Sequence, residues 1–158
     1  MMVFKRRFGA GALVMSEGGV LLQQRASIEH EPLTWGIFGG TAEDGEFAPH
    51  DCMVREVREE TGIDVERLPS KLIYEFNDRS GSFSYFTYLV TLPARVQPTL
   101  DAETHQAAWF DLGTSPADLW SMLPSPLHSG FGDLVRNERT VQSVLEALHS
   151  HERSARIG

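Results

Sequence analysis

The chain has 158 residues, of which 41% are hydrophobic and 23% are charged, and its formal net charge is −8 at pH 7. These values are typical of a globular protein, and we expect residues 1–158 to fold as a single domain. The negative charge argues against a nucleic acid polymer or an anionic membrane as partner, because both require a basic surface.

The N-terminal part of the chain predicts a β-hairpin. Two largely apolar segments, residues 8–15 and 20–24, flank Glu-Gly-Gly at residues 17–19, which is a typical hairpin sequence. The mostly polar residues 26–34 then predict a loop. No stretch of the sequence reaches the roughly 18 apolar residues that a membrane-spanning helix needs, so we expect no membrane association.

Residues 49–61 predict a helix. Pro49 suits the first helical position, and Gly62 suits a left-handed stop at the C-terminus. One face carries the residues expected to pack on the core: Met53, Val54 and Val57. Cys52, the single cysteine, allows no disulfide within the chain and favours a cytoplasmic location. We expect it to be a small buried hydrophobic side chain rather than a reactive thiol.

Three carboxylates crowd the end of this helix. Glu56, Glu59 and Glu60 follow the spacing i, i+3 and i+4, which puts them on one face. The helix dipole disfavours each charge there by about 0.3–1 kcal/mol, and mutual repulsion adds roughly 0.2–0.5 kcal/mol per pair. The face is therefore either a solvated acidic surface or the binding site of a divalent cation. Hard oxygen ligands suit Mg²⁺ or Mn²⁺.

The segments around these acids form a longer motif. A glycine-rich run at residues 35–46 predicts a short strand at 35–38 and ends with Gly40, five residues and Glu46. Arg55 to Ile63 then reads R-E-V-R-E-E-T-G-I. Together they resemble the signature of the Nudix hydrolases, G-x5-E-x7-R-E-U-x-E-E-x-G-U, where U is a bulky apolar residue. Eight residues rather than seven separate Glu46 from Arg55. We expect the extra residue before the helix, and the spacing alone does not show whether Glu46 still reaches Arg55.

The resemblance implies a Nudix α/β/α sandwich, with a mixed β-sheet and the loop–helix–loop of residues 40–63. It also implies that Mg²⁺, or Mn²⁺, is bound by the three helix carboxylates and by the carbonyl of Gly39. Gly40 is expected to contribute to substrate binding, because glycine lets the backbone approach a ligand closely.

Two residues outside the motif are further candidates. Residues 21–25 resemble the segment that closes one wall of the nucleotide site in MutT-like members, so Arg25 is either a phosphate or base contact or a surface arginine. Glu103 stands six residues before Trp109 and is either a metal ligand and catalytic base or an exposed loop acid. Glu59 is the other candidate base, and His105 is a weaker one.

The second half of the chain predicts alternating strands and helices. We expect strands at 72–76, 83–92 and 109–112, a short helix at 115–122, a loop at 123–132 and a C-terminal helix at 141–149, with a frayed tail at about 151–158. The loop either covers the site or links helices. The aromatic residues of 83–88 are expected to pack on the sheet, although one could stack on a base.

The implied activity is Mg²⁺-dependent hydrolysis of a nucleoside diphosphate linked to another group. A nucleoside triphosphate, such as one with an oxidised purine, would give a monophosphate and pyrophosphate, and nucleotide sugars, dinucleoside polyphosphates and ADP-ribose stay open. The alternative functions are a non-catalytic nucleotide-binding sensor on the same fold and an interaction domain with solvated acids. The resemblance allows a homodimer, but the sequence does not fix the oligomeric state.

Overall fold

A computed structural model describes the backbone of residues 7–157 and the side chains of residues 7–151. Its strands are β1 (Arg7–Ser16), β2 (Gly19–Arg25), β3 (Trp35–Gly36), β4 (Phe38–Thr41), β5 (Ser70–Asn77), β6 (Phe83–Thr91) and β7 (Thr104–Asp111). Its helices are α1 (Pro49–Thr61), α2 (Ser129–Arg136) and α3 (Glu138–Ile157). None of the helices in this part of the chain combines the length and the apolar character needed to cross a membrane.

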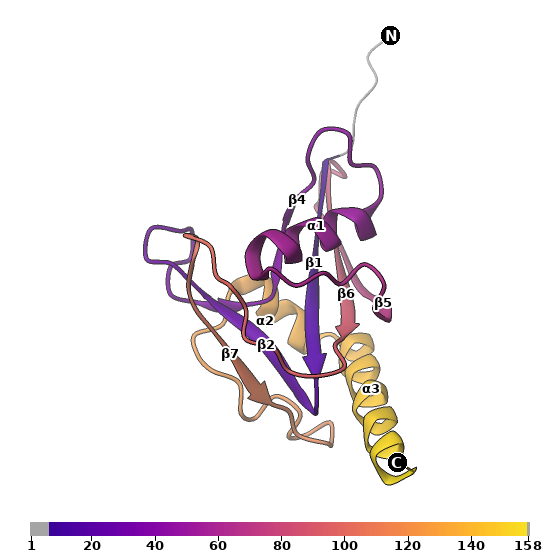
Figure 1. Ribbon diagram of the computed structural model, residues 1–158. Helices are drawn as coiled ribbons and strands as arrows, with labels where there is room; N and C mark the ends of the chain where they lie inside the picture. Colours follow the sequence, from indigo (N-terminus) through magenta and orange to yellow (C-terminus); the bar gives the residue numbers. More distant parts are fainter. Residues whose placement is uncertain (1–6, 158) are drawn as a thin grey trace.

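β1 is the central strand of a mixed sheet. It pairs in parallel with β6 and antiparallel with β4, and it forms a hairpin with β2. Glu17 and Gly18 at the hairpin turn both have positive φ, 49° and 76°, which matches the twist of a tight two-residue turn. Beyond the hairpin, β2 leaves β1 and pairs with β3 and β7. This divergence is visible in Figure 1, where β2 and β7 splay away from β1.

Helices cover both faces of the sheet, as the resemblance implied. In Figure 1, α1 crosses in front of β1 and α2 lies behind the sheet. Alternation along β1 explains the two layers, because Ala12 and Val14 are buried against the α1 residue Val57. Leu13 is buried instead in the core that contains residues of α2 and α3. The fold is therefore an α/β/α sandwich.

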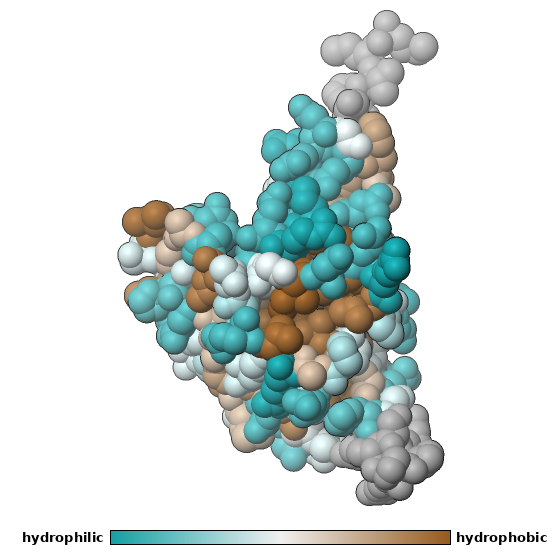
Figure 2. Space-filling view, in the orientation of Figure 1, coloured by the Kyte–Doolittle hydropathy of each residue, from teal (hydrophilic) through white to brown (hydrophobic). Residues whose placement is uncertain are grey.

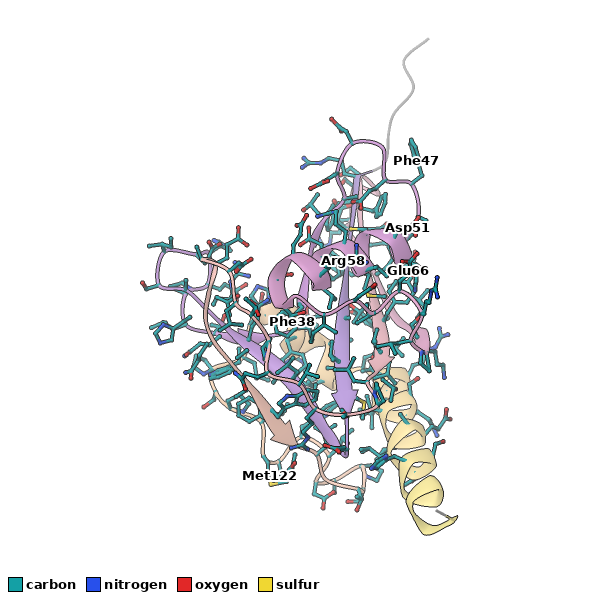
Figure 3. The ribbon with its side chains drawn as sticks, in the orientation of Figure 1. Phe38, Phe47, Asp51, Arg58, Glu66 and Met122 are labelled. Carbon is teal, nitrogen blue, oxygen red and sulfur yellow. The ribbon has the colours of Figure 1, made fainter. Side chains whose placement is uncertain are left out.

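The signature helix has the predicted bounds and caps. Pro49 opens α1, and Gly62 ends it with φ of 77°, its N–H donating to the carbonyl of Arg58. Cys52 is buried, as expected. The exposed side chains of Asp51 and Arg58 lie on the outer side of the helix (Figure 3). The surface over α1 and the preceding loop is largely hydrophilic (Figure 2).

The C-terminal part of the chain differs from the expectation in four places. The strand predicted at 109–112 is longer, because β7 begins at Thr104 through its pairing with β2. The helix predicted at 115–122 is wrong: residues 116–122 form turns, and Asp118 accepts hydrogen bonds from the backbone and hydroxyl of Ser115, a local pairing that competes with a helix. Part of the predicted loop at 123–132 belongs to α2, whose glycines at 130 and 132 suggested a break. α3 continues to Ile157, through most of the segment expected to fray, and residue 158 lies outside the described residues.

Candidate active site

A cavity of about 500 Å³ opens between the diverging strands and α2. One wall carries Gln23 and Arg25 of β2, and another is formed by Gly39 and Gly40 of β4. Aromatic side chains of β5, β6 and α2 line the far side: Tyr74, Phe76, Phe83, Tyr85 and Phe131. The volume and the mixture of aromatic and polar groups suit a small organic ligand.

Glu60 lies at the bottom of this cavity. Its side chain is buried, with 6% of the residue surface exposed. One carboxylate oxygen accepts a hydrogen bond from the Gly39 N–H (2.8 Å), and the other accepts one from Gln23 Nε2 (3.0 Å). Burial, with a smaller contribution from the charge of Glu56, raises the pKa of Glu60 to about 8 against the lowering effect of these two hydrogen bonds. The site therefore holds a desolvated carboxylate beside a second acid.

Glu56 faces the signature loop. A Cβ atom on Gly40 would lie 2.6 Å from the Glu56 carboxylate, so glycine is required for this close approach. Burial raises the pKa of Glu56, Arg55 lowers it, and the charges of Glu59 and Glu103 raise it. Glu103 is thus brought into electrostatic contact with the helix acids, although it is far from them in sequence.

Arg55 binds several acids at the outer rim of the site. Its Nη1 lies 3.0 Å from both Glu56 Oε1 and Glu59 Oε2. Its Nε and Nη2 donate to the two oxygens of Glu46 at 2.8 and 2.9 Å. The extra residue before the helix therefore does not prevent the pairing of Glu46 with Arg55.

The two candidate bases occupy different positions. Glu59 has a 54% exposed side chain and lies at the rim beside Arg55. Glu103 lines the cavity just before β7. Its N–H donates to Asp101 Oδ1 at 3.1 Å, and its carbonyl accepts from the Ala26 N–H at 2.9 Å. Glu103 and His105 are both exposed, but His105 is not part of the cavity lining.

Arg25 lines the cavity but is also bound to the loop of residues 26–34. Its Nε donates to the His30 carbonyl, and its Nη2 lies 3.6 Å from Glu29. The same loop reaches α2 through Glu31, which accepts hydrogen bonds from the backbone and hydroxyl of Ser129 and lies 2.9 Å from His128 Nε2. The loop and α2 thus form one wall of the cavity.

The donor set fits a hard divalent cation. All candidate donors are oxygens, and the pKa values of Glu56 and Glu60 are both raised by burial. Within the described residues, no group of three or more acidic, histidine or cysteine side chains is already arranged to hold a metal ion. Mg²⁺ commonly binds to one or two carboxylates together with substrate phosphates, rather than in an all-protein cage. Glu56 and Glu60 provide such a pair next to an open cavity.

Sequence reasoning missed several groups that line the cavity. Gln23 lies within residues 21–25, two positions before Arg25. Side chains two positions apart on a strand share a face, and this spacing indicates that Gln23 lies near the site. Phe83 and Tyr85 face the cavity, whereas Phe86 of the same strand packs on Phe8 at the other face. His128 and Phe131 escaped notice because their segment was expected to be a loop.

The fold and the acidic cavity agree with the resemblance of residues 40–63 to the Nudix signature. A sequence model of the NUDIX domain matches residues 5–125. The chain is 31% identical over 162 residues to "Putative 8-oxo-dGTP diphosphatase 3" of Mycobacterium tuberculosis, covering 96% of this chain and 70% of that protein. It is 33% identical over 84 residues to the 8-oxo-dGTP diphosphatase of Proteus vulgaris, covering 52% of this chain and 74% of the other.

A solved structure shows the same fold. The crystal structure of RenU, a Nudix hydrolase from M. smegmatis, superposes with a TM-score of 0.65 at 23% identity, over 92% of this chain and 87% of RenU. The chain belongs to the NUDIX family. It is a MutT-like Nudix pyrophosphohydrolase.

Proposed function

We propose that the enzyme hydrolyses a nucleoside triphosphate with an oxidised purine, 8-oxo-dGTP, in a Mg²⁺-dependent reaction. The main support is the pair of neighbouring carboxylates with raised pKa values, Glu56 and Glu60, of which Glu60 lines an aromatic cavity. The substrate class is supported by the similarity to two proteins named as 8-oxo-dGTP diphosphatases. Water would add to one phosphorus, the phosphoanhydride bond would break, and the products would be the monophosphate and pyrophosphate.

The cation would be held by the carboxylates of Glu56, Glu59 and Glu60 and by the carbonyl of Gly39, with Glu103 as a further ligand. Mn²⁺ would satisfy the same oxygen donors. When bound, the ion supplies charge neutralisation for the phosphates and orients the attacking water. Because Glu60 is desolvated, water would screen its attraction for a cation less than at an exposed site.

The chain's own groups would do the remaining work. Gly40 would let the phosphates approach the backbone closely, and its lack of a side chain leaves room for the Glu56 carboxylate. Arg25 would contact the substrate at the wall that it shares with the 26–34 loop. Glu103 or Glu59 would accept the proton of the attacking water. Glu103 has the better position, because it lines the cavity while Glu59 lies at the rim beside Arg55.

The composition supports two further parts of this proposal. A net charge of −8 favours free nucleotides over nucleic acid polymers or membranes, and the single cysteine favours the cytoplasm. A homodimer is the oligomer to look for, by size-exclusion chromatography with light scattering.

The test is a substrate panel assayed with Mg²⁺, with Mn²⁺ and with EDTA. The panel contains 8-oxo-dGTP, dGTP, ADP-ribose, a nucleotide sugar and a dinucleoside polyphosphate. We expect 8-oxo-dGTP to be turned over with the highest kcat/KM, no turnover in EDTA, and near-complete loss in Glu60→Gln. Glu66→Gln, which changes an exposed acid, is the matched control. Nucleotide binding without turnover of any member of the panel would instead indicate the sensor function.

A further inference from the structure

Gln23 connects three separate parts of the active site. This buried side chain, with 6% of the residue exposed, donates from Nε2 to Glu60 Oε2 and to the carbonyl of Ile37, both at 3.0 Å. Its Oε1 accepts a hydrogen bond from the hydroxyl of Thr104 at 2.7 Å. The amide of Gln23 is therefore hydrogen-bonded to three elements. These are α1 through Glu60, the connection between β3 and β4 through Ile37, and β7 through Thr104.

The surroundings fix the orientation of the amide. The Ile37 carbonyl can only accept, so Nε2 must point toward it and toward Glu60 in either protonation state of that acid. The Thr104 hydroxyl holds Oε1 on the opposite side. Glu60 also accepts from the Gly39 N–H, so each of its oxygens receives one donor and retains a lone pair for another partner.

Thr104 reaches Gln23 because of a register shift. Gln24 pairs with Gln106, whereas Arg25 pairs with Thr104, so His105 is the extra residue of a bulge between β2 and β7. Thr104 is nearly fully buried. Its hydroxyl is 3.2 Å from Asp101 Oδ1, which also accepts from the Glu103 N–H. The turn at Asp101 therefore positions two residues. It holds Thr104 against Gln23, and it holds Glu103 at the cavity.

We propose that Gln23 and Thr104 are positioning residues that fix Glu60 and, through the Asp101 turn, Glu103 relative to each other. Neither side chain touches the reacting atoms. Their effect is to present two acids from distant parts of the chain, 43 positions apart in sequence, in one geometry for a divalent cation. This inference depends on the proposed role of Glu60 as a metal ligand. Loss of such an outer hydrogen-bond partner typically costs about 10–100-fold in metal affinity or activity.

The experiment measures Mn²⁺ binding to the substrate-free protein by electron paramagnetic resonance, together with the Mg²⁺ concentration that half-activates turnover. Gln23→Met removes the amide at nearly constant length, and Thr104→Val removes only the hydroxyl. Thr104→Ser retains the hydroxyl and should restore binding. Gln24→Met is the matched control, because Gln24 is the adjacent glutamine of the same strand but bonds to Leu33 and Gln106 instead.

We expect Gln23→Met to weaken Mn²⁺ binding by about 10–100-fold and Thr104→Val by about 10-fold, while Thr104→Ser and Gln24→Met bind like the parent. The double variant should lose less than the product of the two single effects, because Thr104 acts on Glu60 only through Gln23. Equal binding by Gln23→Met and Gln24→Met, or a double variant that loses the product of both effects, would overturn the inference.

A parent protein that neither binds Mn²⁺ nor turns over any nucleotide would instead overturn the proposed function. Circular dichroism melting identifies a variant that fails to fold, in which case Thr104→Val and Thr104→Ser carry the test.

Discussion

The guanidinium of Arg55 binds the carboxylate of Glu46 through two parallel hydrogen bonds, Nε to Oε2 at 2.8 Å and Nη2 to Oε1 at 2.9 Å. Eight residues separate the two in sequence, one more than the family signature allows. The pairing survives because Pro49 opens α1 at the expected place, so the additional residue is accommodated in the preceding loop. Arg55 consequently retains its place between the loop and the helix acids.

Replacing Glu46 by Gln should destabilise the fold by about 1–3 kcal/mol, because the Arg55 pair is largely shielded from water and one charged hydrogen bond is lost. Arg55 lowers the pKa of Glu46 in the folded protein. The stabilisation is therefore present above the unfolded pKa, near 4.5, and is lost as the pH falls through the lower folded value. Urea denaturation at pH 7 and pH 3 measures both effects. Asp44→Asn in the same loop is the control, and equal stability of the two variants at pH 7 would contradict the prediction.

Glu60 should give the metal-free protein an opposite dependence on pH. Its pKa is raised from 4.5 to about 8 by burial, so its contribution favours folding below pH 4.5 and is lost as the pH rises toward 8. The free energy of unfolding in EDTA should fall over this range, by at most about 1.4 kcal/mol per pH unit from this group. Glu60→Gln should flatten the fall, and Mg²⁺ should stabilise the parent more at pH 8 than at pH 5. A slope that is identical in the parent and in Glu60→Gln would refute this account.

Gly40→Ala should separate activity from stability. The atoms nearest to the new methyl group would be those of the Glu56 carboxylate, at 2.6 Å, and that side chain can rotate away. We expect a stability change within about 1 kcal/mol but a loss of kcat of at least about tenfold, because Glu56 leaves its position. Gly11→Ala is the contrasting variant, since its methyl group would meet the Phe38 carbonyl at 2.5 Å and should lower the melting temperature instead.

The choice of base is tested by comparing Glu103→Gln with Glu59→Gln. Glu103 lines the cavity, whereas Glu59 lies at the rim and is bound by Arg55. If Glu103 accepts the proton, Glu103→Gln should lower kcat by about 10²–10⁴-fold even at saturating metal, whereas Glu59→Gln should act mainly on metal affinity. Steady-state kinetics and Mn²⁺ titration distinguish the two. A larger loss of kcat in Glu59→Gln would assign the base to Glu59.

Local patterns predicted much of the framework. The bounds and caps of α1, the face shared by its glutamates and the first hairpin all follow from residues close together in sequence, because helix periodicity, proline at the first turn and glycine at a left-handed stop act over a few positions. The helix expected at 115–122 fails for a related reason, since Asp118 pairs with Ser115 and so forms a local structure that periodicity does not reveal.

The sequence alone places Glu56, Glu59 and Glu60 on one helix face and predicts a metal site there. The folded structure adds that Glu60 is buried against Gln23, that Glu59 is bound by Arg55, and that Glu103 lines the same cavity as Glu60. Burial and pKa values depend on the residues that strand pairing and a single bulge bring together. These residues form no periodic pattern in the sequence, so periodicity does not predict their contacts.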